Sequence, residues 1–507
     1  MGVTRRELLL AAGVGIGGLA ATAMGAASAS ALINSPASST NAPVYRSSGG
    51  RLRVDLTAGT DAVKVNGVTT RGLQTYNGRF PAPTLIVKPG DRLQVRLTNN
   101  TSALSNLHFH GLHVSPRGLQ DNVFAEIEPA GTRAYDVRIP QDHPSGLFWY
   151  HPHFHTESGP QVWSGLSGLI IVQGGAADLP GVAGLRRHAF GIREGGLGPD
   201  GEWAEYTTLT PATSTLYVNG QVNPRISMRP GETQFWQLGN IGVAAYYRIG
   251  LDDHEFTVVE EDGAMVWRTW TTDTLDFPPG KRFGVLVTAR RRTGTVQLRQ
   301  LGYDQGKDVW PEFPLVRVAI EGNEASSVTV PEEIADPPSW LKDDIVQRRV
   351  LTLSQAIVDG APEFYIDGEL FDNLTFQDVI QVKLGTTEEW IIRNSSSLYA
   401  GAPHDEQHPF HIHVNDFAVV ETGDWDPLTD VVSNRVRVVP RSTADTVNVP
   451  WNSYVRFRTH FADFVGRSVY HCHLLFHEDH GMMGIFDIVD EDGKGAGPAQ
   501  RLPTHQH

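Results

Sequence analysis

The sequence predicts an all-β fold of three consecutive β-sandwich domains. Its 507 residues include 52 Gly and 31 Pro, which separate many short β-branched runs, and few stretches have a helical period. That pattern is typical of β-sandwiches. A strand–turn–strand motif also recurs three times at domain-sized spacing. Roughly 475 residues follow a predicted export signal, enough for about three domains of ordinary size.

Residues 1–31 are predicted to be an export signal and not part of the fold. Arg5 and Arg6 precede an apolar Ala/Gly-rich run, which ends in an A-x-A-like cleavage site at 29–31. Paired arginines indicate the twin-arginine route, so we expect a periplasmic, cell-surface or secreted protein. A G-x-G-x-x-G match at 13–18 follows no strand and therefore predicts no nucleotide site.

Charge and composition exclude several classes of partner. The formal charge of −15 and the pI near 5.7 argue against nucleic acid, which requires a basic surface. After the signal no apolar run reaches the ~18 residues that span a bilayer, so we expect no membrane span in the mature form. The single cysteine excludes an intramolecular disulfide. We expect a monomer stabilised by burial across large sheets.

Three similar stretches predict three copies of one domain. Each reads as a strand, a glycine-containing turn, and a second strand that ends at Asn. The turn glycines Gly90, Gly231 and Gly385 are 141 and 154 positions apart, which fits repeated domains better than a short solenoid repeat. A Pro-rich segment at 332–338 is the expected linker before the third copy. The expected domains are 45–178, 179–335 and 345–490.

The most informative stretch is His471-Cys472-His473, followed by His477 and Met482. A thiolate, an imidazole and an axial thioether are ligands of blue-copper electron-transfer sites, which also need a second His. If the stretch is a strand, Cys472 faces away from His471 and His473. One segment would then contact two metal sites and conduct electrons between them. The alternative is a buried apolar cysteine beside solvated histidines.

The distribution of histidines favours the metal interpretation. Of 20 His, seven lie from His108 to His155 and nine from His404 to His480, so the first and third domains are expected to carry the metal chemistry. The middle domain would then set the spacing of the metal-carrying domains or shape the site. Four His-x-His pairs occur, namely His108/His110, His151/His153, His411/His413 and His471/His473. Eight imidazoles exceed the needs of one metal, whereas three coppers would use them all. His408 then remains as the second His of the blue-copper site.

These motifs resemble those of a known family. The segments 108–111, 149–153, 408–413 and 471–482 look like the four copper-binding motifs of three-domain multicopper oxidases, and bacterial laccases, including spore-coat laccase, are similar in pattern. The resemblance covers nearly the whole mature chain and fills all twelve ligand positions. It implies three consecutive cupredoxin-like domains, each a Greek-key β-sandwich. It also implies four copper ions, one of type 1 in the third domain, and one of type 2 and a type 3 pair between the first and third.

The resemblance also implies a role for each ligand. The implied type 1 ligands are His408, Cys472 and His477, with Met482 axial. The implied type 2 ligands are His108 and His411. The implied type 3 ligands are His110, His151 and His473 for one copper, and His153, His413 and His471 for the other.

Four further residues lie near these motifs. Asp121 and Glu478 occupy positions where relatives have acidic groups that deliver protons to oxygen, with a solvated loop carboxylate as the alternative for Asp121. His113 and His155 fall outside the pattern, and we expect packed or surface roles for both. If His155 shared a strand face with His151, hydrogen bonding behind the metal ligands would be its alternative role.

The implied activity couples four one-electron oxidations of a reductant to the four-electron reduction of O2 to water. Phenols or aromatic amines are the expected reductants, as for a laccase. The alternative is a Cu(I) or Fe(II) metallo-oxidase. Copper-efflux relatives carry a Met-rich insert, whereas in this chain only Met228 and Met265 lie outside the signal and the site. A non-enzymatic envelope or division protein is a remote alternative, since the ligands are complete, and two-domain nitrite reductases lack four His-x-His pairs.

Overall fold

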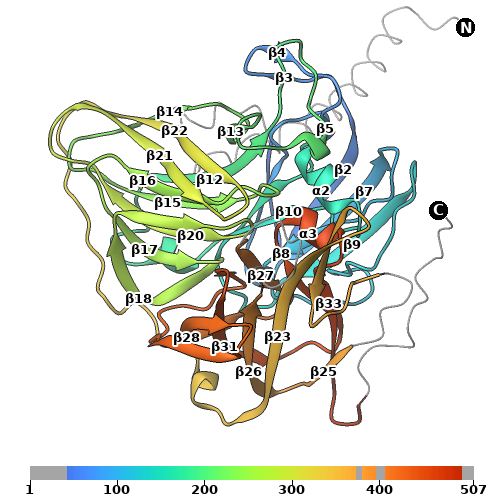
Figure 1. Cartoon of the computed structure of the whole chain (residues 1–507). Helices are drawn as coiled ribbons and strands as arrows, with labels where there is room; N and C mark the ends of the chain where they lie inside the picture. The colour runs from blue at the N-terminus through green and yellow to red at the C-terminus, as the bar shows by residue number, and fades with distance from the viewer. Residues whose placement is uncertain (1–42, 373–378, 396–405, 494–507) are drawn as a thin grey trace, which may run out of the picture.

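The computed structural model describes residues 43–372, 379–395 and 406–493 (Figure 1). In this part of the chain the strands form six sheets of four to six strands and one two-stranded ribbon. Figure 1 shows three groups of strands that follow chain order, coloured blue to cyan, green to yellow and orange to red. The predicted all-β fold is confirmed.

Each group contains two sheets of hydrogen-bonded neighbouring strands. In spatial order, the first group has β1 (Val44–Arg46), β6 (Thr84–Val87), β11 (Gly168–Val172), β10 (Gly146–His151) and β8 (His108–His110), then β5 (Gln74–Tyr76), β2 (Arg51–Thr60), β7 (Arg92–Asn100) and β9 (Thr132–Arg138), and the ribbon β3 (Lys64–Val65) and β4 (Val68–Thr69). The second has β13 (Thr215–Val218), β12 (Arg187–Gly195), β15 (Thr233–Asn240), β20 (Arg282–Thr288), β17 (Phe256–Glu261) and β18 (Ala264–Thr272), then β14 (Arg225–Met228), β22 (Val309–Ile320), β21 (Gly294–Asp304), β16 (Tyr247–Leu251) and β19 (Thr274–Phe277). The third has β24 (Ala361–Ile366), β23 (Ile345–Val358), β26 (Thr386–Asn394), β31 (Ser453–Phe461), β28 (Phe417–Asp426) and β29 (Val431–Arg437), then β25 (Ile380–Lys383), β33 (Met483–Val489), β32 (Gly466–Cys472), β27 (His408–Ile412) and β30 (Thr446–Val449).

The strand–turn–strand repeat forms the same structure in every group. Its two strands are β6 and β7, β14 and β15, or β25 and β26, and in each case they enter different sheets. The first strand of the repeat is hydrogen-bonded in parallel to the last strand of its group. The second strand is hydrogen-bonded in parallel to a strand near the start of its group, which is β2, β12 or β23. The turn glycines Gly90, Gly231 and Gly385 have φ of 85°, 76° and 76°, a conformation that glycine adopts without steric cost.

The asparagine that ends each repeat holds the loop that follows it. Asn99 Nδ2 donates to the carbonyls of Ala103 and Ile127, both at 2.8 Å. Asn394 Nδ2 donates to those of Glu406 (2.7 Å) and Val449 (3.0 Å). The next strands are β8 and β27, which carry histidines of the predicted metal motifs, so these bonds position the start of each motif.

Every group has its own apolar core. Phe109, Trp236 and Trp390, one from each group, are 0% exposed and belong to three separate clusters of buried side chains. Because sheet faces must bury their apolar sides, each sheet pair forms a sandwich around one core.

Few helices interrupt the strands of the described residues. They are α2 (Ser158–Trp163) and α3 (Leu475–Asp479), with the 3-10 turns η2 (Gly175–Asp178), η3 (Tyr206–Thr208) and η4 (Ser339–Lys342). Asp479 accepts the backbone N–H groups of Ser158 (3.2 Å) and Gly159 (2.7 Å), so α3 of the third group docks against α2 of the first.

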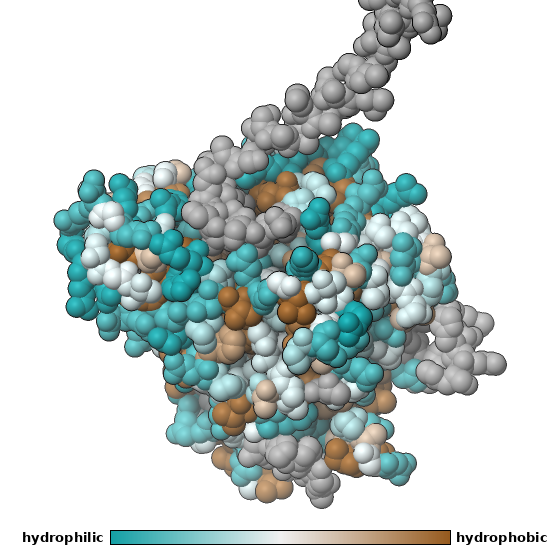
Figure 2. All heavy atoms as spheres, turned by 90° about the horizontal axis from the view of Figure 1, so that it is seen from above, coloured by the Kyte–Doolittle hydropathy of each residue, from teal (hydrophilic) through white to brown (hydrophobic). Residues whose placement is uncertain are grey.

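The surface is mainly hydrophilic on the face seen from above, where apolar residues are scattered in small groups (Figure 2). Among the described residues, no helix combines the length and the apolar content that a membrane crossing needs.

Candidate metal centre

Four strands from the first and third groups carry most of the predicted ligands. On the first group's sheet, His108 pairs with His151 across β8 and β10. On the third group's sheet, His411 pairs with His471 across β27 and β32. The hydrogen-bond registers therefore place histidines from distant positions in the sequence at neighbouring points.

The eight histidines of the His-x-His pairs form one buried cluster, since none is more than 3% exposed. Rings from the two groups stack directly, with centroids 3.9 Å apart for His108 and His413 and 4.0 Å apart for His110 and His411. The cluster thus lies between the first and third groups, as expected from the sequence.

Nitrogen atoms within the cluster face one another at short distances. His471 Nε2 lies 3.2 Å from His153 Nε2 and 3.1 Å from His413 Nε2. His473 Nε2 lies 3.2 Å from His110 Nδ1. Two imidazole nitrogens bound to one metal ion at about 2.0 Å are about 3 Å apart, so this spacing suits shared coordination.

The protonation of the rings also fits metal binding. The Nε2 atoms of His108, His151 and His411 are buried without a hydrogen-bond partner in the described part of the chain. Their Nδ1 atoms contact Asp121 (3.0 Å), the carbonyl of Pro152 (2.8 Å) and the carbonyl of Asp445 (2.9 Å) respectively. Burial lowers the pKa of His151 to about 3. The rings are therefore neutral and direct a lone pair inward, as metal ligands must.

A second group of ligand atoms lies on the other face of β32. Cys472 Sγ is 3.6 Å from His408 Nδ1 and 3.7 Å from His477 Nδ1, and the two nitrogens are 3.2 Å apart. Met482 is fully buried in the same apolar cluster as Cys472, whose N–H donates to the Met482 carbonyl at 3.1 Å. A buried set of one sulfur and two imidazoles is suited to a blue-copper ion.

Alternation along two adjacent strands separates the two sites. On β32, Cys472 belongs to the sulfur-containing group, whereas His471 belongs to the eight-histidine cluster. On β27, His408 and His411 divide in the same way. The predicted arrangement, in which one segment contacts two sites, therefore matches the geometry.

The implied ligand sets are matched in part. Mutually close ligand atoms include His408/Cys472/His477 and His153/His413/His471, which coincide with the implied type 1 set and one type 3 set. The remaining close groups are His108/His110/His151, His108/His411/His413 and His110/His411/Asp445. His108 belongs to two of these groups, so the remaining division of ligands among coppers stays a prediction.

Both predicted acidic residues lie against cluster histidines. Asp121 is 4% exposed and receives the Phe109 N–H at 3.0 Å as well as contacting His108, so the solvated-loop alternative is wrong. Burial raises the pKa of Asp121 to about 7. Glu478 is fully buried, with Oε2 3.1 Å from His471 Nδ1 and Oε1 3.5 Å from His153 Nδ1. Burial opposes its ionisation, but the two histidines outweigh that effect and hold the pKa of Glu478 well below its usual range.

Two carboxylates that contact the candidate ligands were not predicted from the sequence. Asp445 Oδ1 lies 3.4 Å from His110 Nε2 and 3.5 Å from His411 Nδ1. Glu406 Oε2 lies 3.4 Å from His477 Nε2, and Glu406 is only 3% exposed. Glu406 precedes His408 by two residues, so its proximity to the motif is a usable signal. No spacing in the sequence marks Asp445.

The two histidines outside the pattern have other roles. His113 contacts the Val414 carbonyl at 2.6 Å and Asp463 at 3.0 Å, near the surface. His155 packs edge-on against Phe371, with ring centroids 5.0 Å apart. Packed or surface roles are confirmed for both. The shared strand face suggested for His155 is wrong, because β10 ends at His151.

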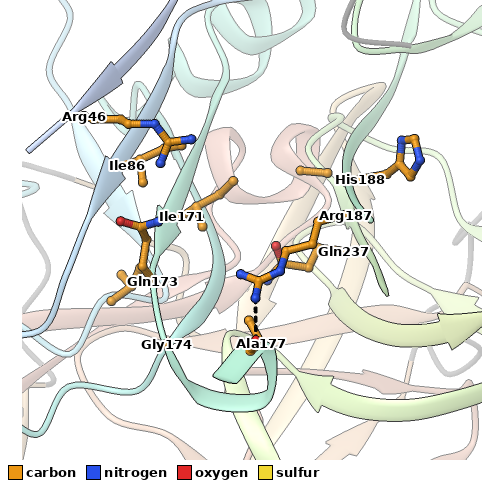
Figure 3. Close-up of a pocket in the computed structure, with 11 residues that line it drawn as sticks. Arg46, Ile86, Ile171, Gln173, Gly174, Ala177, Arg187, His188 and Gln237 are labelled. Carbon is orange, nitrogen blue, oxygen red and sulfur yellow. Dashed lines mark hydrogen bonds between the residues drawn. The ribbon is translucent and has the colours of Figure 1, made fainter. Parts of the chain in front are cut away.

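A pocket between the first and second groups is separate from these sites (Figure 3). Its lining includes Ile171 of β11, Gln237 of β15, and the arginines Arg46 and Arg187. Arg187 donates to the Ala177 carbonyl. No lining residue belongs to either candidate metal group, so the pocket has no direct part in the metal chemistry.

Comparison with known proteins agrees with this geometry. Three family models described as multicopper oxidase match residues 57–177, 197–300 and 349–492. A multicopper oxidase of Staphylococcus haemolyticus is 25% identical over 447 residues, covering 85% of this chain and 86% of that protein. A laccase of Bacillus subtilis is 24% identical over 484 residues, covering 82% and 90%. A solved multicopper oxidase of Campylobacter jejuni, described as a metallo-oxidase, superposes with a TM-score of 0.72 at 24% identity, covering 89% of this chain and 94% of that one.

The fold and the two buried ligand groups define a copper-dependent oxidoreductase that uses O2 as electron acceptor. The chain belongs to the multicopper oxidase family, whose members use four copper ions, one of type 1, one of type 2 and a type 3 pair. It couples one-electron oxidations of a reductant to the four-electron reduction of O2 to water.

Proposed function

We propose that this oxidase is laccase-like and takes its electrons from phenols or aromatic amines. The proposal rests on the paucity of methionine, since only Met228 and Met265 lie outside the signal and the site, and Met228 is buried. A thioether-rich surface suited to Cu(I) is therefore lacking in the sequence. The Bacillus subtilis relative named laccase supports the same choice.

We further propose that the twelve residues identified from the sequence hold the copper ions. The single observation that carries this assignment is the backbone link between the two sites. Cys472 lies with His408 and His477, and its neighbours His471 and His473 lie in the eight-histidine cluster. The implied sets are His408, Cys472, His477 and axial Met482 for type 1, His108 and His411 for type 2, and His110, His151 and His473 with His153, His413 and His471 for type 3.

When bound, four copper ions supply the one-electron redox chemistry and store the four electrons that reduction of one O2 requires. The covalent path from Cys472 to His471 or His473 connects the electron-entry site to the cluster. Asp121 and Glu478 contact His108 and His471 respectively. Because burial raises the pKa of Asp121 to about 7, this carboxyl can hold a proton near neutral pH, whereas Glu478, whose pKa lies well below its usual range, is ionised and can accept one. Four protons are consumed for each O2.

One observation favours the metallo-oxidase as a second candidate. The Glu406 carboxylate contacts His477 Nε2, the outer nitrogen of a proposed type 1 ligand. An oxygen ligand at that position suits a hard or borderline ion such as Fe(II) better than an uncharged phenol. Lys307 lies 5.6 Å from the Phe476 ring beside this site, and its positive charge opposes the approach of a cation. We therefore rank the phenol first.

The proposed setting follows the sequence expectations. Residues 1–31 would direct twin-arginine export, and the mature protein would act in the periplasm, at the cell surface or outside the cell as a monomer. Domains at 45–178, 179–335 and 345–490 would each contain one sheet pair, which spans 44–172, 187–320 or 345–489.

Oxygen uptake by the copper-loaded protein tests the choice of reductant. A methoxyphenol and Cu(I) are supplied in parallel, and Cys472→Ser serves as the blank because it removes the sulfur ligand. We expect uptake with the phenol at low added copper, no blue colour in Cys472→Ser, and at least a ~100-fold lower rate in that variant. Uptake with Cu(I) alone would replace the laccase proposal by the metallo-oxidase. Full activity of Cys472→Ser would refute the ligand assignment.

A further inference from the structure

Arg282 is a buried cation of the middle group that reaches the other two groups. It begins β20, is 0% exposed, and uses all five of its N–H donors. Nε donates to the Leu147 carbonyl (3.2 Å), Nη1 to the Gly280 carbonyl (3.0 Å) and Nη2 to the Asp262 carbonyl (2.7 Å). Nη1 and Nη2 also bind the two carboxylate oxygens of Asp445, at 2.7 and 2.6 Å. One side chain therefore joins β10, its own sheet and the third group.

Asp445 stands between Arg282 and the eight-histidine cluster. Its Oδ1 lies 3.4 Å from His110 Nε2, and its carbonyl accepts the Nδ1–H of His411 at 2.9 Å. Thr446 Oγ1 also donates to Asp445 Oδ1, at 2.8 Å. The residue thus contacts one histidine from each of two proposed copper ligand sets.

Asp445 is held in place from the middle group as well. Asp262 accepts the backbone N–H groups of Asp445 and Thr446, both at 3.2 Å, and pairs with Lys281 at 2.9 Å. The loop that carries Asp445 is therefore fixed by three charged residues from the turn and strands of one sheet.

Gly111 shows how closely this pair approaches the cluster. Gly111 follows His110 and has a φ of 81°. A Cβ atom there would collide with Arg282 Nη2 and would lie 2.6 Å from Asp445 Oδ2. The glycine of the first copper motif is required partly because the Arg282–Asp445 pair occupies the adjacent space.

A bidentate buried ion pair is not an efficient way to stabilise contacts between domains. Apolar residues of similar volume commonly stabilise a protein as well or better, because desolvation opposes ion pairing. What the planar guanidinium adds is a fixed carboxylate orientation. Groups that hydrogen-bond to the outer nitrogens of metal-bound imidazoles orient the rings and strengthen metal binding.

On these grounds we propose that Arg282 is a positioning residue of the middle domain, which orients His110 and His411 through Asp445 and so sets the copper affinity of the cluster. The inference rests on the proposed copper assignment. It gives the middle domain, which has no proposed copper ligand, a direct influence on the site.

The test compares copper retention at the two sites of one molecule. Purified, copper-loaded variants are exposed to a chelator, total copper is measured by atomic absorption, and the blue site is followed by its visible absorbance. The variants are Arg282→Met, Asp445→Asn and the double variant, in which no buried charge of the pair is left uncompensated. Arg225→Met is the matched control, since Arg225 of the same domain forms an exposed ion pair with Glu321 at 2.7 Å.

We expect the cluster to bind copper about 10- to 100-fold more weakly in Arg282→Met and in the double variant, with the blue site unchanged. Asp445→Asn should show a smaller loss, because the Asp445 carbonyl still holds His411. Arg282→Lys should recover part of the copper affinity of the cluster, because lysine keeps the positive charge but not the planar, two-pronged donor geometry of the guanidinium.

Three results would overturn the inference. The first is cluster affinity within about twofold of the wild type in Arg282→Met or in the double variant. The second is equal loss of blue-site and cluster copper, which indicates a merely structural role. The third applies if Arg282→Met does not fold: the double variant and Arg282→Lys are then compared, and wild-type copper affinity of the cluster in both would overturn the inference. A wild-type chain that binds no copper would instead refute the ligand assignment.

Discussion

At the residue scale, the neighbours of a side chain determine which of its protonation states the fold favours. The outer nitrogens of His151 and His411 donate to carbonyls of Pro152 and Asp445, which leaves the inner nitrogens unprotonated. Burial then keeps the rings neutral, since it disfavours the charged form. The histidines are thus prepared for a metal before it binds, by backbone groups that most sequences could supply.

Burial lowers the pKa of these histidines, but it raises the pKa of a carboxyl group. Glu260, which lies in the middle group away from the metal sites, is such a case. It is 1% exposed, its Oε2 accepts the Gln237 amide at 2.8 Å, and its Oε1 has no hydrogen-bond partner within the described residues. Burial raises the pKa of Glu260 from 4.5 to about 8. The folded state therefore holds this proton more tightly than the unfolded state does, so its stabilising contribution is complete below about pH 4.5 and is lost as the pH rises towards 8.

We expect Glu260→Gln to remove this pH dependence. The variant should gain up to roughly 4 kcal/mol over the wild type at pH 9 and differ little at pH 5. Urea unfolding of both proteins at the two pH values measures the difference. Glu321→Gln, at an exposed ion pair, is the control and should change the free energy of unfolding by less than about 0.5 kcal/mol. An equal gain at both pH values would contradict the explanation.

At the scale of the element, the recurring strand–turn–strand unit organises both the sheets and the metal loops. In every group its final asparagine binds two backbone carbonyls, one in the loop that follows and one farther along the chain. In the middle group Asn240 Nδ2 donates to those of Ala245 (2.8 Å) and Phe277 (3.1 Å). The strands themselves were predictable from alternation and turn glycines. The role of the asparagine was not, because its partners lie as far as 55 positions away.

Replacing Asn240 by Ala should destabilise the protein although Asn240 is not itself a proposed metal ligand. Two buried carbonyls lose their donor, which costs about 2–4 kcal/mol. Thermal and urea unfolding measure the loss, and Asn323→Ala, at an exposed position, serves as the control. Stability equal to that of the control would show that the two bonds are replaced by water.

At the scale of the whole molecule, the metal ligands join parts of the chain that fold around separate cores. His108 and His413 come from different sandwiches, and their rings stack at 3.9 Å. Copper bound there would connect the first and third sandwiches, while Arg282 connects the second to both. Binding to the folded state alone stabilises it by mass action.

Copper removal should therefore lower thermal stability. We expect the melting temperature of the chelated protein to fall by about 5–15 °C, and readdition of copper should restore it. Calorimetry of the two forms measures the change, and Cys472→Ser separates the contributions, since it retains only the eight-histidine cluster. An unchanged melting temperature would mean that domain contacts alone determine stability.

Much of the fold, and which residues gather at the candidate site, could be predicted because both depend on short-range sequence patterns. Alternation predicted the opposite orientations of Cys472 and His471, and repeated turns predicted three sandwiches. Alternation failed for His155 because β10 ends at His151, and the Pro152 that follows has no N–H for a ladder. Arg282 and Asp445 could not be found, since they are 163 positions apart and only tertiary folding pairs them.

The adjacency of β27 and β32 has a consequence for how this protein can change in length. A shift of one residue in either strand exchanges the faces of all its side chains. In β32 such a shift would place a sulfur among the clustered imidazoles and an imidazole at the sulfur site, so both sites would be lost at once. An insertion or deletion within either strand would therefore disrupt both sites. The segments that follow carry proposed ligands as well, since His413 comes after β27, and His473, His477 and Met482 lie between β32 and β33. An engineer who wishes to retune this oxidase should therefore keep the residue count of these two strands and of the segments directly after them fixed, and vary only the length of loops that carry no residue of the proposed sites.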